Sequence, residues 1–572
     1  MKPPRLRSSL QNPGRSAPAV VRVRFVSTLG KEAANGPRVG RISQSATLQR
    51  MILLRINPPL AVVGARLLVF LWLFLMLPAL AASPKSFRPN IVYILADDMG
   101  IGDVSCLNPG SAWRTPNLDR LAREGMVFTD AHSASAVCTP SRYALLTGRY
   151  SWRGRLKQSV LHGYDPSLIE PGRLTVPGLL REHGYITAMV GKWHLGLDWV
   201  HTGPRLEEVD FSKPFGGGPV AHGFDSFYGI SASLDMPAYC YLENNRVVQT
   251  PTGKIGDSPK PPMWRGGPIS PDFQHADVLP RLTERALTFI AAQSAAPDTK
   301  PFFLYFALTA PHTPISPTPE FQGKSHTNPY GDFTLQVDAI VGRVLAAIEA
   351  RGLAKNTLVI FTADNGCAPA ANLEELRKFQ HDPSAGYRGH KADIYEGGHR
   401  IPFIARWPGK TPAGRRCAQV IGQLDLLATC ADLLDSPLPA DAGEDSVSML
   451  PLLHGLEPQS PLRDGLVHES DQGWLALRQG KWKLCFCPGS GGWSFPKPGK
   501  DCEGLPPFQL FDLATDPAEK TNLAAAHPET IQQLGRRMRS YIELGRSTPG
   551  TPQTNTPSSN WPQTAWMKDF PK

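Results

Sequence analysis

Two sequence features that often indicate a protein's cellular compartment, a glycosylation sequon and a membrane-spanning apolar run, are missing from this 572-residue sequence. It contains no Asn-X-Ser/Thr sequon, which excludes N-glycosylation and favours a bacterial exported protein over a lysosomal one. Its most apolar run, residues 67–77, is shorter than the roughly 20 residues that a membrane-spanning helix needs. The short apolar run argues against a stably membrane-anchored protein.

The chain also lacks an excess of positive charge in the part that we expect to fold. Lys and Arg outnumber Asp and Glu by 60 to 50, for a net charge of +10 and a pI of 9.1. Twelve of the basic residues and one acidic residue lie in residues 1–82. Residues 83–572 therefore hold 48 basic and 49 acidic residues, a net charge of −1, which excludes nucleic acid as an expected partner.

Residues 1–82 are typical of a basic presequence that ends in a secretory signal peptide. Two arginines precede the apolar run 67–77, and the small-residue site Ala79-Leu80-Ala81 follows it. The order predicts cleavage there and export to the periplasm or the medium, with no stable membrane span afterwards; an uncleaved anchor is the alternative. Met51 stands where a signal peptide begins, so residues 1–50 are either an upstream artefact of the reading frame or a disordered extension.

Beyond residue 83 the hydrophobic pattern alternates between strands and helices, which indicates an α/β fold. Helices are expected at residues 116–124, with Thr115 as N-cap, and at residues 333–351. The expected buried strands are short β-branched and aromatic runs at residues 91–95, 186–190, 302–306, 357–361 and 403–405. We predict a large mixed, mostly parallel sheet sandwiched by helices, in a catalytic domain of residues 83–462.

The pattern changes near residue 463. Short strands joined by tight turns are expected at residues 466–469, 474–478, 482–486 and 509–513, before a helix at 528–544. We predict a smaller C-terminal antiparallel sheet plus helix, residues 463–545, and a disordered tail, residues 546–572. Two Gly/Pro-rich stretches, 201–222 and 250–275, are expected to be long surface loops that carry specificity.

The most informative segment is Cys138-Thr139-Pro140-Ser141-Arg142, which closes with Leu146-Thr147-Gly148-Arg149. A lone cysteine is usually a small hydrophobic residue in the core. The proline, serine, arginine and glycine residues at fixed distances from Cys138 argue against that interpretation here. Pro140 suits the first turn of a helix, so Cys138 is expected near a helix N-terminus, where backbone N–H groups favour an anion. Arg142 lies about one turn further on the same face. The segment resembles the signature of the formylglycine-dependent sulfatases.

Residues 184–194, which end in Gly191-Lys192-Trp193-His194, resemble the second signature of the same family. A lone Lys-X-His means little, because both side chains are usually solvated. Alternation places Lys192 and His194 on one side of the extended chain and Trp193 on the other.

Acidic side chains follow two of the expected strands. Asp97 and Asp98 follow the first strand, and Asp364 and Asn365 follow a later one. Each pair alone is more often solvated loop, but open α/β folds bind ligands at the carboxyl edge of the sheet, where both pairs would emerge. Three carboxylates and an amide suit a hard cation, and Ca²⁺ is the expected ion.

The resemblance implies a fold, a modification and a reaction. The fold is that of the alkaline phosphatase superfamily, and the reaction is the hydrolysis of sulfate monoesters by an arylsulfatase-like sulfuric ester hydrolase. Cys138 would be oxidised to formylglycine (3-oxoalanine) by a formylglycine-generating or anaerobic sulfatase-maturing enzyme. One hydroxyl of the hydrated aldehyde would attack sulfur, and the second would then expel sulfate, so water need not attack sulfur again.

The resemblance also implies residue roles. His312 and Lys391, from Ala310-Pro311-His312 and Gly389-His390-Lys391, would contact the sulfate and the ester oxygen, while His390 and His399 would be supporting or structural. His194 would be the base. One Ca²⁺ ion would be bound by Asp97, Asp98, Cys138, Asp364 and Asn365. The catalytic residues would be Cys138, Arg142, Lys192, His194, His312 and Lys391.

With Cys138 converted, eight of the nine cysteines remain, and Cys485, Cys487 and Cys502 are close enough in sequence for a local disulfide bridge. A zinc site is the weaker alternative, because no fourth ligand is spaced nearby. A sulfated carbohydrate is the first expectation for the substrate and an aryl sulfate the second. Aromatic residues near the two loops would either stack on sugars or pack internally: Trp199, Trp264, Tyr239 and Tyr241.

Two other functions remain open from the sequence. A phosphonate or phosphodiester hydrolase of the same superfamily can also carry formylglycine. A non-catalytic relative that binds sulfated glycans would keep the fold, although every matched position is present here.

Overall fold

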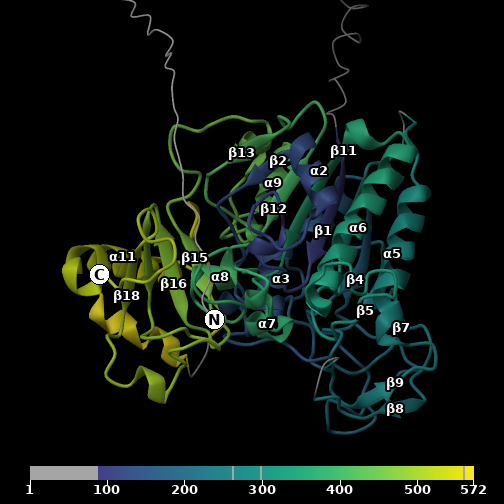
Figure 1. Cartoon of the computed structure of the whole chain (residues 1–572), viewed down its shortest axis with the longest axis horizontal. Coiled ribbons are helices and arrows are strands. Elements are labelled where there is room, and N and C mark those ends of the chain that lie inside the picture. The colour runs from purple at the N-terminus through teal and green to yellow at the C-terminus, as the bar shows by residue number, and fades with distance from the viewer. Residues whose placement is uncertain (1–87, 260–262, 297–298, 558–560, 572) are drawn as a thin grey trace, which may run out of the picture. The chain divides into compact units, whose positions relative to one another are not determined.

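The centre of the fold is a ten-stranded sheet whose middle strands are buried on both faces (Figure 1). We analysed a computed structural model, which describes residues 88–259, 263–296, 299–557 and 561–571; the expected signal peptide lies outside these residues. The strand order is β13 (Arg415–Cys417), β2 (Met126–Phe128), β12 (Phe403–Arg406), β11 (Thr357–Ala363), β1 (Asn90–Ala96), β10 (Phe302–Ala307), β4 (Ile186–Lys192), β5 (Ser226–Ile230), β6 (Leu242–Glu243) and β7 (Arg246–Val247).

The five middle strands, from β11 to β5, pair in parallel. Ile91 of β1 is in register with Phe303 of β10 on one side and with Leu358 of β11 on the other. The outer pairs β11–β12, β12–β2, β5–β6 and β6–β7 are antiparallel. Continuous apolar strands such as β1 are typical of parallel sheets covered on both faces. The predicted mixed, mostly parallel sheet is confirmed.

Helices form a layer on each face of the sheet. One layer contains α2 (Pro116–Glu124), α5 (His275–Ala291) and α6 (Pro329–Ala350), which pack on one another. The other contains α3 (Cys138–Thr147), α4 (Val176–Glu182) and α9 (Leu426–Leu433). Smaller elements complete this part: β3 (Ala131–His132), β14 (Ile421–Gly422), β8 (Gly253–Ile255), β9 (Gly267–Ile269), α7 (Leu373–Lys378), α8 (Glu396–His399) and α10 (Leu450–Leu453).

One detail of α2 differs from the prediction. Thr115 does not cap the helix with its side chain, because Thr115 and Ser105 exchange hydrogen bonds between their backbone N–H groups and hydroxyls. The carboxylate of Asp338, on α6, accepts from the backbone N–H groups of Asn117 and Leu118 instead. The cap therefore comes from a residue more than 200 positions away, which a local pattern cannot show.

The C-terminal sheet has the order β15 (Leu466–Glu469), β16 (Leu475–Gln479), β17 (Trp482–Cys485) and β18 (Gln509–Asp512), all antiparallel. Helix α11 (Pro528–Glu543) packs on β16 and β17. This sheet lies to the side of the large one (Figure 1). The predicted smaller sheet with one helix is confirmed, and its boundary at residue 463 stays a prediction.

The predicted disordered tail is wrong for its described residues. The 3-10 helix η10 (Pro562–Asp569) brings Trp566 onto Phe486, with ring centroids 3.9 Å apart, and Phe570 is fully buried. Ser, Thr and Pro dominate the composition of this segment and hide the few aromatic side chains that anchor it. Burying such rings offsets the entropy of ordering a polar segment.

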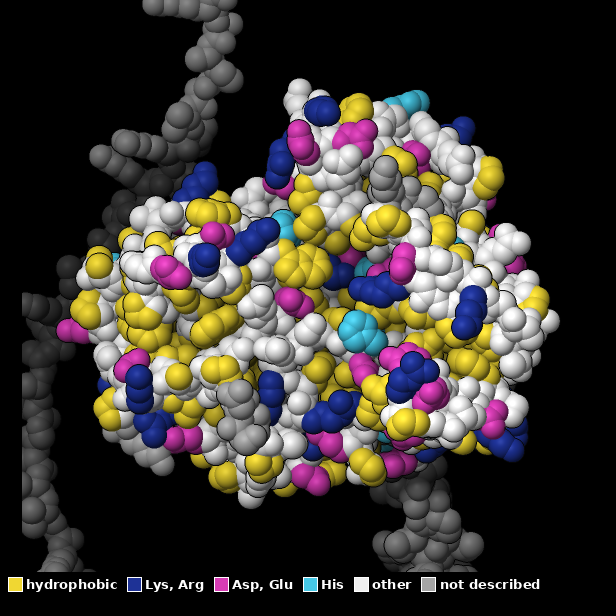
Figure 2. Space-filling view, turned by 90° about the horizontal axis from the view of Figure 1, so that it is seen from below, with side chains coloured by type: hydrophobic (Ala, Val, Ile, Leu, Met, Phe, Trp, Pro, Cys, Tyr) yellow, Lys and Arg dark blue, Asp and Glu magenta, His cyan; other side chains and the backbone are white. Residues whose placement is uncertain are grey.

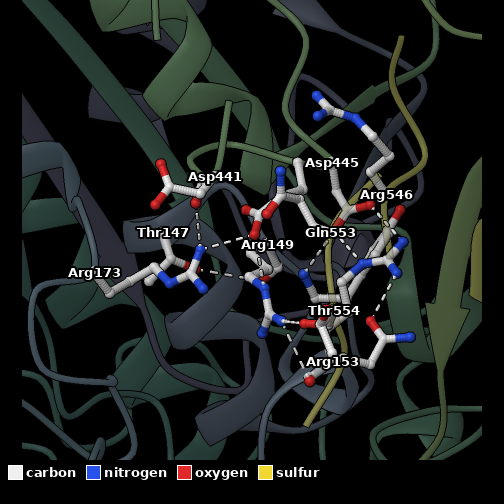
Figure 3. Close-up of polar contacts among 12 residues, drawn as sticks. Thr147, Arg149, Arg153, Arg173, Asp441, Asp445, Arg546, Gln553 and Thr554 are labelled. Atoms are coloured by element: carbon white, nitrogen blue, oxygen red, sulfur yellow. Dashed lines mark hydrogen bonds and ion pairs between the residues drawn. The ribbon is translucent and has the colours of Figure 1, made fainter. Parts of the chain in front are cut away.

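Residues 546–557 are held by arginines that follow α3 (Figure 3). Arg149 Nη2 donates to Thr554 O at 3.4 Å, and Arg153 Nη1 donates to Asn555 Oδ1 at 3.2 Å. Arg153 is itself fully buried and forms a two-pronged ion pair with Asp445, with both N···O distances 2.8 Å. Arg149, the last residue of the first signature, is therefore a structural residue in this fold.

The expected local disulfide bridge is not formed. All nine cysteines are described and all are free, including Cys485, Cys487 and Cys502. The thiols of Cys487 and Cys502 instead lie within hydrogen-bonding distance of the carbonyls of Gly489 and Lys497. In the described part of the chain no helix is both long and apolar enough to cross a bilayer.

We predict that Arg153→Met lowers the free energy of unfolding by about 3–5 kcal/mol, because it leaves Asp445 buried without its cationic partner. Urea unfolding followed by tryptophan fluorescence measures the change. The control is Arg205→Met, which breaks a solvent-exposed pair with Glu208 and is expected to change little. Equal effects of the two variants would contradict the role of Arg153.

Candidate active site

The candidate site lies where the carboxyl ends of the central strands meet. Asp97 and Asp98 follow β1, Asp364 and Asn365 follow β11, and Lys192 ends β4. These ends point downward in Figure 1, and the surface on that side is hollowed near its centre, with charged and histidine side chains around the hollow (Figure 2). Cys138, the first residue of α3, is fully buried there.

A glycine makes the position of Lys192 possible. Gly191 has a φ of 120°, and a Cβ built on it would lie 1.7 Å from the carbonyl oxygen of Ala307 on β10. Only glycine therefore allows β4 to lie this close to β10 and still turn Lys192 into the site.

Three ion pairs bind the site together. Arg142 Nε and Nη2 donate to Asp364 Oδ2 at 3.1 and 2.8 Å, and Lys192 Nζ contacts both oxygens of Asp97 at 2.8 Å. Lys391 Nζ donates to Asp98 Oδ2 at 2.7 Å. Every partner is at least nine-tenths buried, so each charge depends on its partner for stabilisation.

Arg142 also fixes the backbone, because its Nη1 donates to Lys192 O at 3.0 Å. Asp364, Asp97 and the Lys192 carbonyl therefore use most of the guanidinium donors. In this arrangement Arg142 orients carboxylates directly.

Charge and burial set the protonation of the site. Burial alone would raise the pKa of Asp97, but Lys192, His312 and Arg142 hold it well below its ordinary value. Burial dominates at Asp364 and raises its pKa, despite Arg142. Burial also raises the pKa of the Cys138 thiol, against the effect of Lys192 and Lys391. An unmodified Cys138 is therefore a thiol rather than a thiolate, and a poor nucleophile.

His194 is buried beside the same cations. Burial, Lys192 and Arg142 hold its pKa well below the ordinary value, so the imidazole is neutral. Its Nε2 lies 2.8 Å from Leu161 O and donates to it, which leaves Nδ1 as an acceptor without a hydrogen-bond partner. The backbone at His194 is left-handed, with a φ of 58°, and its carbonyl accepts from Thr139 Oγ1 at 3.0 Å.

His312 completes the ring of side chains. Its Nε2 lies 3.4 Å from Asp98 Oδ2, and its Nδ1 lies 2.6 Å from Thr313 O. Asn365 donates from Nδ2 to Asp98 Oδ1 at 2.7 Å, while its own Oδ1 is buried without a partner. The structure thus brings together all ten of the residues that the sequence pointed to.

These residues fit a hard divalent cation. Ligand atoms of Asp97, Asp98, Cys138 and His312 lie within 4.8 Å of one another. Asp364 and Asn365 adjoin them, and the orphaned Oδ1 of Asn365 is a free oxygen donor of the kind such ions bind. Carboxylate and amide oxygens favour Ca²⁺ or Mg²⁺ over softer metals.

A second group of ligand-type side chains, His132, Glu396 and His468, is also buried. Lys483 Nζ lies 3.1 Å from Glu396 Oε1, and Arg400 Nη2 lies 3.1 Å from Glu396 Oε2. This group offers one carboxylate, already paired with two cations, whereas the first site offers three, so the charge here favours a divalent cation much less. His399, expected to be structural, stacks on His468 with ring centroids 4.6 Å apart.

Sequence reasoning missed Ser233. Its Oγ lies 3.1 Å from Lys192 Nζ and 3.2 Å from His312 Nε2, so it joins two of the candidate catalytic groups. Ser233 follows β5 at the same edge of the sheet as the acidic pairs, but a serine after a strand belongs to no motif that would single it out. Three of the aromatic residues considered for a sugar-stacking rim, Trp199, Tyr239 and Tyr241, are buried and pack internally.

A family model described as Sulfatase matches residues 89–436, more than half of the chain. The chain belongs to the sulfatase family. Sulfatases are sulfuric ester hydrolases, so the protein is an enzyme of that class. The expectation from the two signatures is confirmed at this level.

Curated proteins that are similar to this chain are also sulfatases. The chain is 35% identical over 496 residues to an N-acetylgalactosamine-6-O-sulfatase of Bacteroides thetaiotaomicron, covering 80% of this chain and 93% of the relative. It is 36% identical over 478 residues to human arylsulfatase A, covering 80% and 89%. It is 31% identical over 501 residues to human N-acetylgalactosamine-6-sulfatase, covering 83% and 89%.

Solved structures show the same fold. A Bacteroides thetaiotaomicron sulfatase structure, titled for the metabolism of multiple glycosaminoglycans, superposes with a TM-score of 0.69 at 34% identity, over 80% of this chain and 99% of that one. A phosphonate monoester hydrolase of Agrobacterium radiobacter superposes with a TM-score of 0.51 at 20% identity, over 82% and 100%. At that identity the second match shows the fold alone.

We predict that Cys138, in protein made without conversion, resists alkylation in the native state. At pH 8 iodoacetamide should label the more exposed Cys502 at least about tenfold faster, because burial removes both access and thiolate from Cys138. Peptide mass spectrometry measures both sites, and unfolding in urea should abolish the difference. Labelling of native Cys138 as fast as Cys502 would contradict the buried, protonated thiol.

Proposed function

We propose that the protein hydrolyses sulfate monoesters with a formylglycine nucleophile made from Cys138. The observation that carries this is the position of Cys138: its Sγ lies 3.7 Å from Asp97 Oδ1, at the start of α3, in a ring of carboxylates and cations. A thiol there is unreactive, whereas a hydrated aldehyde supplies two hydroxyls, one to attack sulfur and one whose deprotonation expels sulfate.

Asp97, Asp98, Asp364 and Asn365 would hold one Ca²⁺ ion together with the modified residue 138. The ion would supply charge that lowers the pKa of a neighbouring hydroxyl and offsets charge on the sulfuryl group. Its ligands are fixed by their own neighbours, since Arg142 orients Asp364 and Lys192 orients Asp97.

His194 is the proposed base. It is neutral, and the proton of its Nε2 is committed to Leu161 O, so its free Nδ1 is the atom that can accept a proton from a hydroxyl at position 138. Arg142 and Lys192 would balance the charge of the sulfuryl oxygens as the bond to sulfur forms.

His312 and Lys391 are proposed to serve the leaving oxygen. Both reach the Asp98 carboxylate, and His312 is slightly open to solvent, at 7% exposure, whereas Asp97 and Asp364 are fully buried. The departing alcohol therefore leaves on the side of these two residues, and His312 or Lys391 protonates or stabilises it there.

A sulfated carbohydrate is the proposed substrate class, and the named relatives point to a 6-O-sulfated N-acetylgalactosamine. An aryl sulfate is the second candidate, since another relative is an arylsulfatase. We also propose that the chain is exported through the signal at residues 67–81 and is activated by a formylglycine-generating or anaerobic maturing enzyme.

We predict that Cys138→Ser and Cys138→Ala both abolish turnover, because neither side chain forms a geminal diol. The loss in kcat should exceed about 1,000-fold on 4-nitrophenyl sulfate. Mass measurement of the peptide that contains residue 138 gives the formylglycine fraction of the wild-type protein. Substantial activity of the serine variant, or full activity of wild-type protein without formylglycine, would disprove the mechanism.

The rival activity is phosphonate or phosphodiester hydrolysis, because the fold alone is shared with a phosphonate hydrolase. We expect kcat/KM for 4-nitrophenyl sulfate to exceed that for bis(4-nitrophenyl) phosphate and 4-nitrophenyl phenylphosphonate by at least about tenfold. The leaving group is the same in all three, so only the transferred group differs. A preference for either phosphorus ester would replace the proposed function by the rival.

A further inference from the structure

Two polar residues on the segment that follows β5, Ser233 and Asp235, adjoin the candidate active site. Ser233, which contacts both Lys192 and His312, is followed two residues later by Asp235. Burial has the largest effect on the pKa of the Asp235 carboxyl and raises it; among the nearby charges His312 lowers it most, followed by Arg265, Lys391 and Lys192. Asp235 is therefore a neighbour of the groups proposed to serve the leaving oxygen.

Only one of the two oxygens of the Asp235 carboxylate has a partner within the protein. Oδ2 forms an ion pair with Arg265 Nη1, whereas Oδ1 is buried and has no hydrogen-bond partner. The residue as a whole is 8% exposed. A buried acceptor without a partner costs free energy, so an unused carboxylate oxygen beside a catalytic centre indicates a ligand that donates a hydrogen bond to it.

The position of Asp235 is fixed mainly by Arg265, which lies between β8 and β9. Arg265 N donates to Asp235 O at 3.0 Å, and Tyr239 Oη lies 2.9 Å from Asp235 O and 2.6 Å from Arg265 O. Arg265 presents half of its own side chain to solvent, at 52% exposure. The carboxylate is thus oriented by contacts that do not use Oδ1.

His275 adds a second unused polar atom. Its ring stacks on Trp264, with centroids 4.8 Å apart, and its Nε2 is buried without a hydrogen-bond partner. Burial lowers the pKa of His275 to about 4, with only partial compensation by Asp235, so the ring is neutral at neutral pH.

The charge of the Asp235 carboxylate determines which ligand groups can bind to it. Burial would raise the pKa of Asp235, but His312 and Arg265 lower it, so the carboxylate is ionised. An ionised carboxylate repels sulfate and every other anionic group. A neutral hydroxyl is the donor that suits it, and polyhydroxylated rings are the substrates that supply one.

We propose that Asp235, oriented by Arg265, binds a hydroxyl of the sugar that carries the sulfate and so selects carbohydrate sulfates over aryl sulfates. The inference rests on the proposed function and specifies its substrate class. Asp235 is a specificity residue that contacts substrate, while Arg265 is a positioning residue.

The test compares Asp235→Asn with wild-type protein of equal formylglycine content. Substrates are N-acetylgalactosamine 6-sulfate and 4-nitrophenyl sulfate, which has no hydroxyl. A hydrogen bond to a charged group corresponds to roughly 10- to 100-fold in kcat/KM. The ratio of kcat/KM for the sugar to that for the aryl sulfate should fall by about this factor in the variant.

Deoxy analogues of the sugar, tested with both wild type and Asp235→Asn, complete a double-mutant cycle. Removing the hydroxyl that Asp235 binds should lower kcat/KM of the wild type by a similar factor and add little to the loss in Asp235→Asn. Asp272→Asn is the matched control, because Asp272 also pairs with an arginine, Arg281, and also has a buried unpartnered Oδ1. It should leave the substrate ratio unchanged.

Two outcomes overturn the inference alone: an equal loss on both substrates, which would assign Asp235 to the general chemistry, and an unchanged ratio. Additive losses for all deoxy analogues would do the same. A different outcome, in which converted wild-type protein hydrolyses neither sulfate ester, would overturn the proposed function itself. Equal thermal midpoints of the variant and wild type show that the ratio does not reflect a folding defect.

Discussion

The structure depends on a charge balance that is buried at one edge of the sheet. Asp97, Asp98 and Asp364 face Lys192, Lys391 and Arg142, and each cation bonds mainly to one carboxylate. Buried charges are stable only when they are paired, so the loss of one cation leaves its partner uncompensated. The groups that would make position 138 reactive are therefore the same ones that hold the ends of β1, β4 and β11 together.

Much of this could be predicted from sequence because the determining features are local. A run of β-branched and aromatic residues predicted a strand at residues 91–95, and β1 is Asn90–Ala96. Parallel pairing then places the residues that follow β1 and β11 at one edge, which is why Asp97 and Asp364 could be expected to meet. The signature around Cys138 predicted both the start of α3 and the family.

The rest could not be predicted because it depends on contacts between distant segments. Ser233 lies in no recognisable motif, and its importance appears only when Lys192 and His312 are seen on either side of it. Thr115 looks like a cap in sequence, yet Asp338 supplies the cap. In the C-terminal segment the polar composition led to a prediction of disorder, although the segment contains a few aromatic residues. Trp566 and Phe570 in fact pack on Phe486 and Phe508, which lie far earlier in the sequence.

The two proposals assign chemistry and recognition to separate, adjacent residues. Ser233 is fixed by Lys192 and His312, so its position follows from the strand ends. Asp235, two residues later, is fixed instead by Arg265 from a loop that belongs to neither strand. A change in residues 250–275 can therefore move the Asp235 carboxylate while Ser233 keeps its contacts. Because loops vary more readily than packed strands, the proposed role of Asp235 would let substrate preference diverge on this scaffold without disturbing the charges proposed to perform the hydrolysis.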